Sequence, residues 1–164
     1  MDLKQLLIIR HAKSSWATIG QNDFDRPLNE RGFRDAPMMA ERLLEKKIRI
    51  DTFISSPAKR AITTANCFAQ VYQFNPQGIE TLPKLYHAYP PVFYEVIDHI
   101  DDNIRTVAIF SHNPGITEFV NELTRTKIDD MPTCGIFALK ANTDKWGSFR
   151  KAEKTFWFFD HPKS

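Results

Sequence analysis

The amino-acid sequence predicts an α/β fold, a three-layer sandwich with a mostly parallel central sheet flanked by helices. Short runs rich in β-branched and aromatic residues alternate along the chain with segments whose apolar residues recur every three or four positions. This alternation is typical of parallel sheets, because parallel neighbours are joined by long crossovers that are usually helices. Hydrophobic residues make up 42% of the 164 residues, enough to bury a core.

Each element rests on its own pattern. The predicted strands are, in chain order, Leu3–Ile9, Asp51–Ile54, Thr106–Phe110, Gly135–Ala141 and Thr155–Phe159. Between them, apolar stripes at helical spacing run over residues 36–44, 58–72, 93–100 and 116–123. Only a turn-like segment separates the last two strands, so we expect them to form an antiparallel edge pair. No repeat, low-complexity tract or linker interrupts the sequence, and we expect a single domain over residues 1–164.

Charge and cysteine usage narrow the function classes. The 22 basic and 20 acidic residues leave a net charge of only +2, which argues against a broad nucleic-acid or membrane surface. The two cysteines, Cys67 and Cys134, have no spacing typical of a zinc site. The aliphatic run Leu6–Ile9 is too short for a signal peptide or a membrane span. We therefore expect a cytoplasmic monomer without metal or cofactor.

Chemically active residues follow the first three predicted strands directly. Arg10 and His11 follow the first, Ser55-Ser56-Pro57 follows the second with Arg60 one turn further, and His112-Asn113-Pro114 follows the third. Because carboxyl ends of parallel strands lie at one edge of a sheet, we expect these residues to converge there. Ser56 and Asn113 are predicted to cap helices that begin at the following proline, so that two helix N-termini also face this edge.

Two arginines, two histidines and two helix N-termini form a site suited to phosphate. Arg10 and Arg60 can each donate two charge-assisted hydrogen bonds to phosphoryl oxygens. Unprotonated His11, fixed by its strand, is predicted to attack phosphorus and form a phosphohistidine that water then hydrolyses. Protonated His112 and Asn113 are predicted to bind the phosphoryl group with the arginines. Two alternatives stay open: a phosphate-binding module without turnover, and a metallohydrolase that uses both histidines.

The segment NDFDRPLNERG, residues 22–32, leaves two readings open. Arg26 is a candidate phosphate ligand, and Asp23 or Asp25 could orient water or pass a proton. Alternatively, Asp25 or Arg26 only holds the loop in place. His87, in a loop-like segment, is a candidate for substrate contact. Lys13, Ser14 and Trp16 are expected at most at the rim of the site.

The sequence resembles the histidine phosphatase superfamily, also called phosphoglycerate mutase-like, and within it the short SixA-like phosphohistidine phosphatases. The resemblance is carried, in this order, by LLIIRHAKSSW, DFDRPLNERG, ISSPAKRAITTA, SHNPGITEFVNEL and MPTCGIFAL. It implies that His11 is phosphorylated, that Arg10, Arg60 and His112 bind the phosphoryl group, and that hydrolysis needs no metal. It also implies a phosphoglycerate mutase-like fold without a large cap insertion.

The resemblance further implies a substrate class, a phosphorylated protein of the histidine phosphotransfer type. The runner-up is a small phosphorylated metabolite, which would make the protein a phosphomonoesterase. Two departures from the family pattern bear on this choice. Ala12 stands where the best-known signature has glycine, and the stretch that holds an acidic proton donor in larger members offers only Glu95, inside a predicted helix. A phosphoramidate needs such an acid less than an ester does, which favours phosphohistidine.

Overall fold

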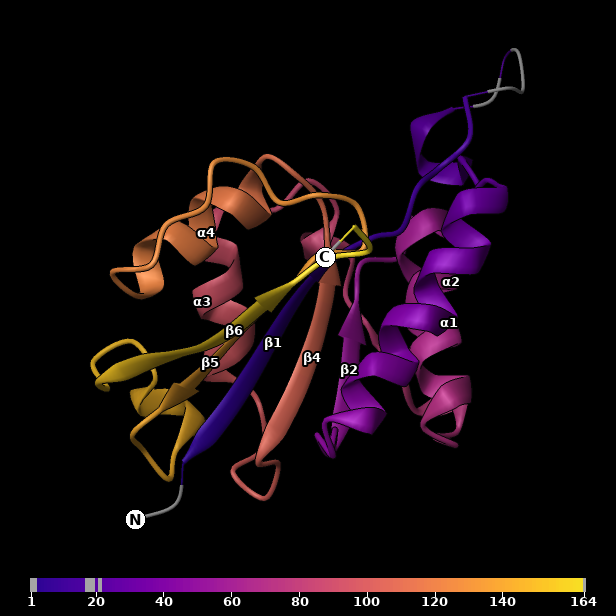
Figure 1. Cartoon of the computed structure of the whole chain (residues 1–164). Helices are drawn as coiled ribbons and strands as arrows, with labels where there is room; N and C mark the ends of the chain where they lie inside the picture. Colours follow the sequence, from indigo (N-terminus) through magenta and orange to yellow (C-terminus); the bar gives the residue numbers. More distant parts are fainter. Residues whose placement is uncertain (1–2, 17–19, 21, 164) are drawn as a thin grey trace.

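Within the described residues, six strands form one mixed sheet in the order β3-β2-β4-β1-β5-β6 (Figure 1). The structure is a computed structural model that describes residues 3–16, 20 and 22–163. The strands are β1 (Lys4–Arg10), β2 (Thr52–Ser55), β3 (Glu80–Thr81), β4 (Thr106–Ser111), β5 (Ile136–Ala141) and β6 (Lys154–Asp160). The helices are α1 (Glu30–Glu45), α2 (Lys59–Val71), α3 (Pro90–Asp98) and α4 (Gly115–Leu123), with short 3-10 turns at Asp23–Asp25, Pro76–Gly78, Pro83–Leu85 and Trp146–Ser148.

The pairing of the strands confirms the predicted sheet. Strand β4 lies between β1 and β2 and is parallel to both, and β3 is parallel to β2. Strand β5 runs antiparallel to β1, and β5 and β6 form the expected antiparallel pair at the edge. The carboxyl ends of β2, β4 and β1 are therefore neighbours, as the sequence predicted.

Helices cover both faces of the sheet, α1 and α2 on one side and α3 and α4 on the other (Figure 1). The side chains of β1 alternate between these layers. Leu6 and Ile8 belong to the core cluster under α3 and α4, whereas Leu7 and Ile9 belong to the cluster under α1 and α2. An uninterrupted apolar run is expected in a strand that is buried on both faces. The three-layer sandwich is confirmed.

Three elements differ from the prediction. Helix α1 begins at Glu30, before the predicted stripe over residues 36–44, so the last residues of the segment 22–32 are helical and not part of a loop. Strand β3 was missed, because its two residues are exposed and carry no apolar alternation. Helix α3 ends at Asp98, before the end of the predicted stripe at Ile100. Ile100 is nevertheless buried in the core beneath that helix. An apolar residue just beyond a helix end can thus extend the stripe without extending the helix.

Among the helices in the described part of the chain, none has both the length and the apolar character needed to cross a membrane.

Candidate active site

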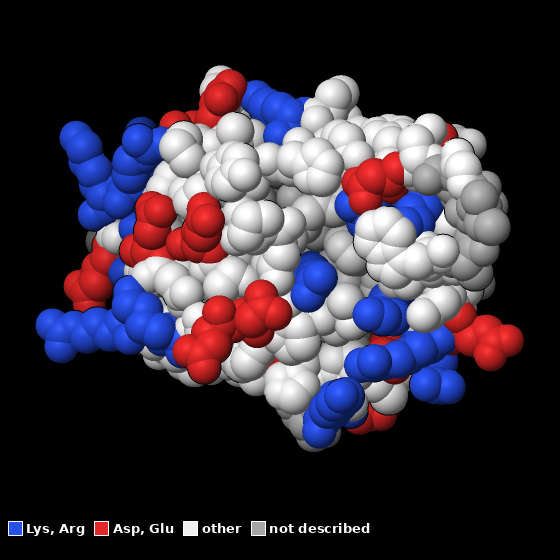
Figure 2. Space-filling view, turned by 90° about the horizontal axis from the view of Figure 1, so that it is seen from above, with Lys and Arg blue, Asp and Glu red and all other residues white. Residues whose placement is uncertain are grey.

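A cavity of about 250 Å³ lies at the edge of the sheet toward which β1, β2 and β4 point. Its described lining residues are Arg10, His11, Lys13, Ser14, Trp16, Asp23, Arg26, Arg60, His87, His112, Asn113 and Thr133. Figure 2 looks down on this side of the molecule, where basic and acidic side chains are interspersed rather than gathered into one continuous basic surface. The described lining of the cavity carries three arginines and one lysine against one aspartate, so the cavity itself is net positive.

The backbone at the end of β1 holds His11 in place. The His11 amide donates to the Ser111 carbonyl at 3.2 Å, and the Cys134 amide donates to the carbonyls of Arg10 and His11 at 3.1 and 3.0 Å. In the His11 ring, Nδ1 lies 2.8 Å from the Ala12 carbonyl oxygen. A carbonyl can only accept, so Nδ1 carries the proton and Nε2 carries the free lone pair. That lone pair belongs to a side chain that lines the cavity.

The surroundings keep the His11 ring neutral. Only 5% of the residue is exposed. Burial lowers the pKa of His11 to about 3, with the charges of Arg10 and Arg60 acting in the same direction and the Ala12 carbonyl opposing them. The Nε atom of Arg60 lies 3.4 Å from His11 Nε2. At neutral pH His11 is therefore an uncharged imidazole whose lone pair faces a guanidinium.

His112 follows β4 and lies beside His11, with 5.3 Å between the two ring centroids. Its Nε2 lies 2.7 Å from the hydroxyl oxygen of Ser56, which follows β2. Burial, followed by the charges of His11 and Arg60, lowers the pKa of His112 to about 2. Without a bound anion His112 is therefore uncharged at neutral pH, and its predicted protonated form needs a negative charge beside the ring.

Asp23 bridges the cations at the mouth of the cavity. Arg60 donates from Nη1 to the Asp23 carbonyl at 2.7 Å and from Nη2 to the carboxylate at 3.0 Å. The Tyr86 hydroxyl donates to the same carboxylate oxygen at 2.6 Å. Burial alone would raise the pKa of Asp23, but the hydrogen bonds from Tyr86 and Arg60 and the charge of Arg60 outweigh it and lower the pKa. Asp23 is thus an anion at neutral pH and has no proton to donate.

Arg26 is placed for both of the roles considered for it. It lines the cavity as a candidate phosphate ligand, and it also holds the loop in place. Its guanidinium donates to the Ser14 hydroxyl, lies 3.2 Å from the Asp23 carboxylate and stacks 3.5 Å from the centre of the Trp16 ring. Ser14, expected only at the rim, is buried.

The end of the same segment, residues 29–32, holds the loop that contains Lys13 and Ser14. The Asn29 side chain caps α1 by accepting from the Gly32 amide, while the Asn29 amide donates to the Lys13 carbonyl. A Cβ at Gly32 would lie 2.2 Å from that Lys13 oxygen. Glycine is required here by close approach of the helix to the loop that carries Ser14.

Three buried nitrogens in this site make no hydrogen bond within the described residues. They are Arg10 Nε, Arg26 Nε and His112 Nδ1. Buried polar atoms are nearly always satisfied in folded proteins, and a cluster of exceptions marks a place where a ligand supplies the partner. Nitrogens of two guanidinium groups and one imidazole suit an oxyanion.

The structure corrects three sequence-based assignments. Helix α2 begins at Lys59 and α4 at Gly115, so neither Ser56 nor Asn113 caps a helix that starts at the next proline. The Ser56 hydroxyl accepts from the Ala58 amide at 3.2 Å, ahead of the helix, and also bonds to His112. The Asn113 side-chain amide donates to Asp130 and to the Met131 carbonyl, although Asn113 lines the cavity. Asp25 is exposed and does not belong to the described lining, because the 3-10 turn directs Asp23 inward in its place.

Several residues of the site were missed by sequence reasoning. Tyr86 donates to Asp23, and the Thr64 hydroxyl accepts from the Ala12 amide at 2.9 Å. Neither follows a predicted strand, so the linear sequence carries no signal for them. Ser56 was expected at this edge, but as a helix cap and not as a partner of His112. Glu95 pairs with Lys84 and lies outside the described lining of the cavity.

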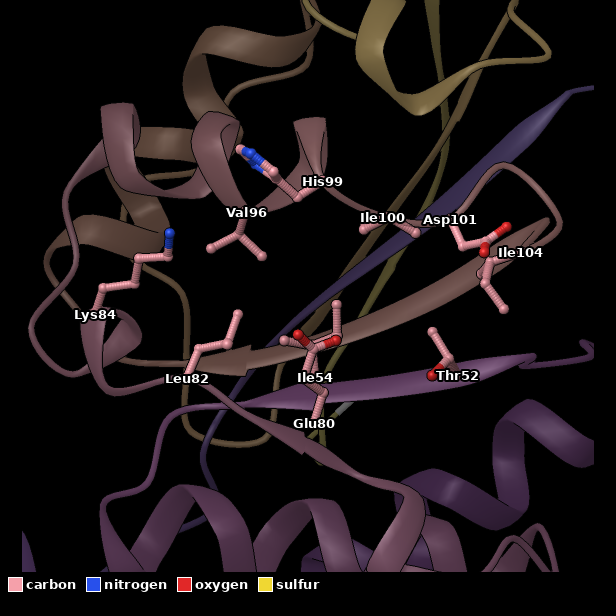
Figure 3. Close-up of a pocket in the computed structure, with 10 residues that line it drawn as sticks. All are labelled: Thr52, Ile54, Glu80, Leu82, Lys84, Val96, His99, Ile100, Asp101 and Ile104. Carbon is pink, nitrogen blue, oxygen red and sulfur yellow. The ribbon is translucent and has the colours of Figure 1, made fainter.

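A larger cavity of about 430 Å³ lies elsewhere, between α3 and the β2–β3 edge (Figure 3). Leu82 and Val96 point toward each other across it, above Ile54. Its polar lining is Thr52, Glu80, Lys84, His99 and Asp101. Its described lining holds no arginine, and its charges of both signs do not select an anion. The smaller cavity is therefore the better candidate for chemistry despite its size.

No group of three or more His, Cys, Asp or Glu side chains is placed to hold a metal ion in the part of the chain that the structure describes.

Comparison with curated proteins finds relatives whose own roles are not described. An uncharacterized chloroplastic protein of Arabidopsis thaliana is 28% identical over 152 residues, which cover 87% of this chain and 69% of that protein. An uncharacterized protein of Mycobacterium tuberculosis is 32% identical over 110 residues, covering 65% of this chain and 63% of that protein. The chain thus spans less than two thirds of the mycobacterial relative.

Comparison with solved structures identifies the fold. SixA from Agrobacterium tumefaciens superposes with a TM-score of 0.81 at 23% identity, covering 97% of this chain and 98% of that one. The protein histidine phosphatase SixA in complex with tungstate gives 0.82 at 22% identity, with 97% of both chains covered. Mycobacterial glucosyl-3-phosphoglycerate phosphatase gives 0.66 at 15% identity, covering 94% of this chain and 97% of that one. These neighbours confirm the phosphoglycerate mutase-like fold.

A sequence profile decides the family. The profile of the histidine phosphatase superfamily (branch 1) matches residues 6–87, half of the 164 residues. The matched stretch contains Arg10, His11, Arg26 and Arg60 of the cavity. The chain belongs to the histidine phosphatase superfamily, branch 1, and is a phosphatase of that kind.

Proposed function

We propose that the protein is a metal-independent phosphatase that works through a covalent phosphohistidine at His11, with phosphohistidine on a protein as its substrate. The observation that carries the proposal is the state of the His11 ring. Its proton is on Nδ1, bound to the Ala12 carbonyl, and its unprotonated Nε2, which accepts a long hydrogen bond from Arg60 at 3.4 Å, lies in a cavity lined by three arginines. A neutral imidazole beside fixed cations is a nucleophile next to an anion site.

Each step follows from the residues that line the cavity. Arg10, Arg26 and Arg60 bind the phosphoryl oxygens and neutralise the charge that develops on them. His11 Nε2 attacks phosphorus in line with the leaving group, so that the N–P bond forms as the bond to the leaving group breaks. Water then attacks phosphorus, the N–P bond breaks with its electron pair returning to Nε2, and phosphate leaves. The guanidinium groups take the neutralising part that a metal ion has in other phosphatases.

His112 and Asn113 are assigned supporting parts in this scheme. A bound phosphoryl dianion places negative charge beside the His112 ring and favours its protonation, which reverses the effect of the surrounding cations. Protonated His112 then donates to a phosphoryl oxygen from Nδ1, the nitrogen that has no partner among the described residues. The Asn113 side chain is occupied by Asp130 and Met131, so only its backbone is left to contact phosphate.

The substrate assignment rests on the open setting of the site. Trp16 is 75% exposed and His87 has 57% of its side chain exposed at the cavity, which suits a substrate carried on a protein surface. We propose one catalytic domain without a cap insertion over this cavity. SixA structures share the fold, and one of them binds tungstate, an oxyanion of the same shape as phosphate.

A small phosphate ester is the second candidate. Its support is a structural neighbour that is named as a phosphatase of glucosyl-3-phosphoglycerate. The experiment compares kcat/KM for a phosphohistidine-bearing phosphotransfer domain with values for nitrophenyl phosphate and sugar phosphates, in wild type and in His11→Ala. The proposal expects the phosphoprotein to be preferred and all turnover to be lost in the variant. A preference for a sugar phosphate would favour the phosphomonoesterase. Turnover in His11→Ala equal to that of wild type would contradict the assignment of His11 as the nucleophile.

A further inference from the structure

The proposed reaction lacks a donor for the proton that the leaving group needs. Alkoxide is a poor leaving group and imidazole nitrogen leaves readily only when protonated, so a group in the cavity that gives a proton would speed the first step. The candidate donors are the titratable side chains of the described lining and Tyr86, which is bonded to Asp23.

Most of them are unsuited to the task. His11 is the nucleophile, and His112 is buried against Ser56. Asp23 is held as an anion by Tyr86 and Arg60, and the Tyr86 hydroxyl proton is itself bound to Asp23. Arginine and lysine side chains are in general poor proton donors to a leaving group at neutral pH.

His87 is the remaining titratable group, and its placement fits a donor. It lines the cavity with 57% of its side chain exposed, on the open side away from the buried nucleophile. Its ring lies 5.9 Å from the His112 ring and 4.0 Å from the Tyr86 ring, centroid to centroid. Its Nε2 lies 3.6 Å from the Asp23 carboxylate, with which it forms an ion pair when protonated. Histidine is also the side chain that gains and loses protons near neutral pH.

The backbone around His87 is fixed rather than loose. His87 has a φ of 58°, in the left-handed region that non-glycine residues seldom adopt. The carbonyl of Leu85, two residues before His87, accepts from the Ser111 hydroxyl at 2.8 Å. The following Ala88 carbonyl packs so closely on Gly115 that a Cβ there would lie 1.7 Å from it. Uncommon backbone geometry held by its neighbours is often found at functional sites.

We propose that His87 is the proton donor to the leaving group. As the bond from phosphorus to the leaving oxygen or nitrogen breaks, that atom takes the electron pair and receives the proton from His87, which becomes neutral. In the second step neutral His87 accepts a proton from the attacking water, and the phosphate departs with its oxygen. His87 returns to its protonated state, so each turnover is balanced. This inference rests on the proposed function, and it gives the site the means to hydrolyse esters as well as phosphoramidates.

The test is the dependence of rate on the leaving group. Wild type, His87→Asn and His87→Gln are compared on nitrophenyl phosphate, phenyl phosphate and glycerol phosphate, whose leaving groups are progressively worse. Asparagine tolerates the left-handed backbone, so the first variant guards against misfolding. His99→Asn is the matched control, because His99 is an exposed histidine that lines the other cavity.

We expect the His87 variants to lose about 100-fold or more in kcat/KM on glycerol phosphate, the size typical of general acid catalysis, and to lose little on nitrophenyl phosphate. His99→Asn should match wild type throughout. An equal loss on all three substrates, or no loss, would overturn the assignment, as would a wild type that turns over only nitrophenyl phosphate. These results would not bear on the covalent intermediate at His11. The absence of that intermediate in wild type would instead contradict the proposed function itself.

Discussion

His11 and His112 are each almost completely buried beside arginine side chains, and burial is the first cause of their lowered pKa values. The consequence for chemistry is a neutral nucleophile at His11. The consequence for folding is that both rings must stay uncharged in the native protein while they titrate normally in the unfolded chain.

This difference predicts a loss of stability in acid. Histidine in an unfolded chain takes up a proton below pH 6.5, whereas His11 in the folded protein does so only near pH 3. Between these values the unfolded state binds more protons, so the free energy of unfolding falls as the pH falls. From pH 7 to pH 5 we expect each buried histidine to cost about 2 kcal/mol.

Urea denaturation at the two pH values measures this. The double variant His11→Asn/His112→Asn should lose most of the pH dependence, since asparagine does not titrate. An unfolding free energy that is equal at pH 7 and pH 5 in wild type would contradict the buried neutral state of the two rings.

How far the site could be predicted also depends on individual residues. Arg10, His11, Arg60 and His112 could be found because each has a charged or catalytic side chain at or near the end of a strand. Thr64 and Tyr86 could not, because their contacts join segments that only the folded chain brings together. Ser56 was placed at the right edge of the sheet, but its bond to His112 was not foreseen. Asp23 and Asp25 were indistinguishable in sequence, and the 3-10 turn decides between them.

At the level of elements, the loops after β1 and β3 are held by helix starts that contain glycine. Gly32 in α1 admits the Lys13 carbonyl, and Gly115 in α4 admits the Ala88 carbonyl. Through these contacts α1 positions the loop of Ser14 and α4 positions the loop of His87. The helix starts therefore shape the cavity through packing, and not as N-termini capped by Ser56 and Asn113, which the sequence had suggested.

Substitution of Gly115 by alanine tests this packing. Its Cβ would lie 1.7 Å from the Ala88 carbonyl oxygen, so the loop or the helix must move. We expect Gly115→Ala to lower the free energy of unfolding by about 1–3 kcal/mol, the usual cost of overpacking, and to reduce kcat/KM as well. Gly147→Ala is the control, because nothing lies within 4 Å of its Cβ, and it should change stability by less than about 0.5 kcal/mol. Denaturation curves in which the two variants agree would exclude the proposed packing role.

The elements themselves were predictable where the sequence carries an apolar pattern, and not where it carries none. The run Leu6–Ile9 reads as a strand buried on both faces and is one. The pair Glu80–Thr81 forms a strand only because β2 offers an edge to it, which no local pattern reveals.

At the scale of the whole molecule, strand order creates the site. Placing β4 between β1 and β2 brings His112 beside His11 across 101 positions of sequence (112 − 11), with Arg60 arriving from α2. The sheet fixes the backbone of His11 and Arg10, and helix α2 carries Arg60. A preorganised cationic site of this kind needs no large rearrangement before phosphoryl transfer.

The most direct test of the central claim is detection of the covalent intermediate. Wild type and His11→Ala are incubated briefly with a radiolabelled phosphodonor, with and without a metal chelator, and quenched. We expect a phosphoprotein in wild type that is stable in alkali and labile in acid, that forms equally with chelator, and that His11→Ala does not form. A label of the same stability in His11→Ala, or turnover in wild type that chelator abolishes, would contradict the account.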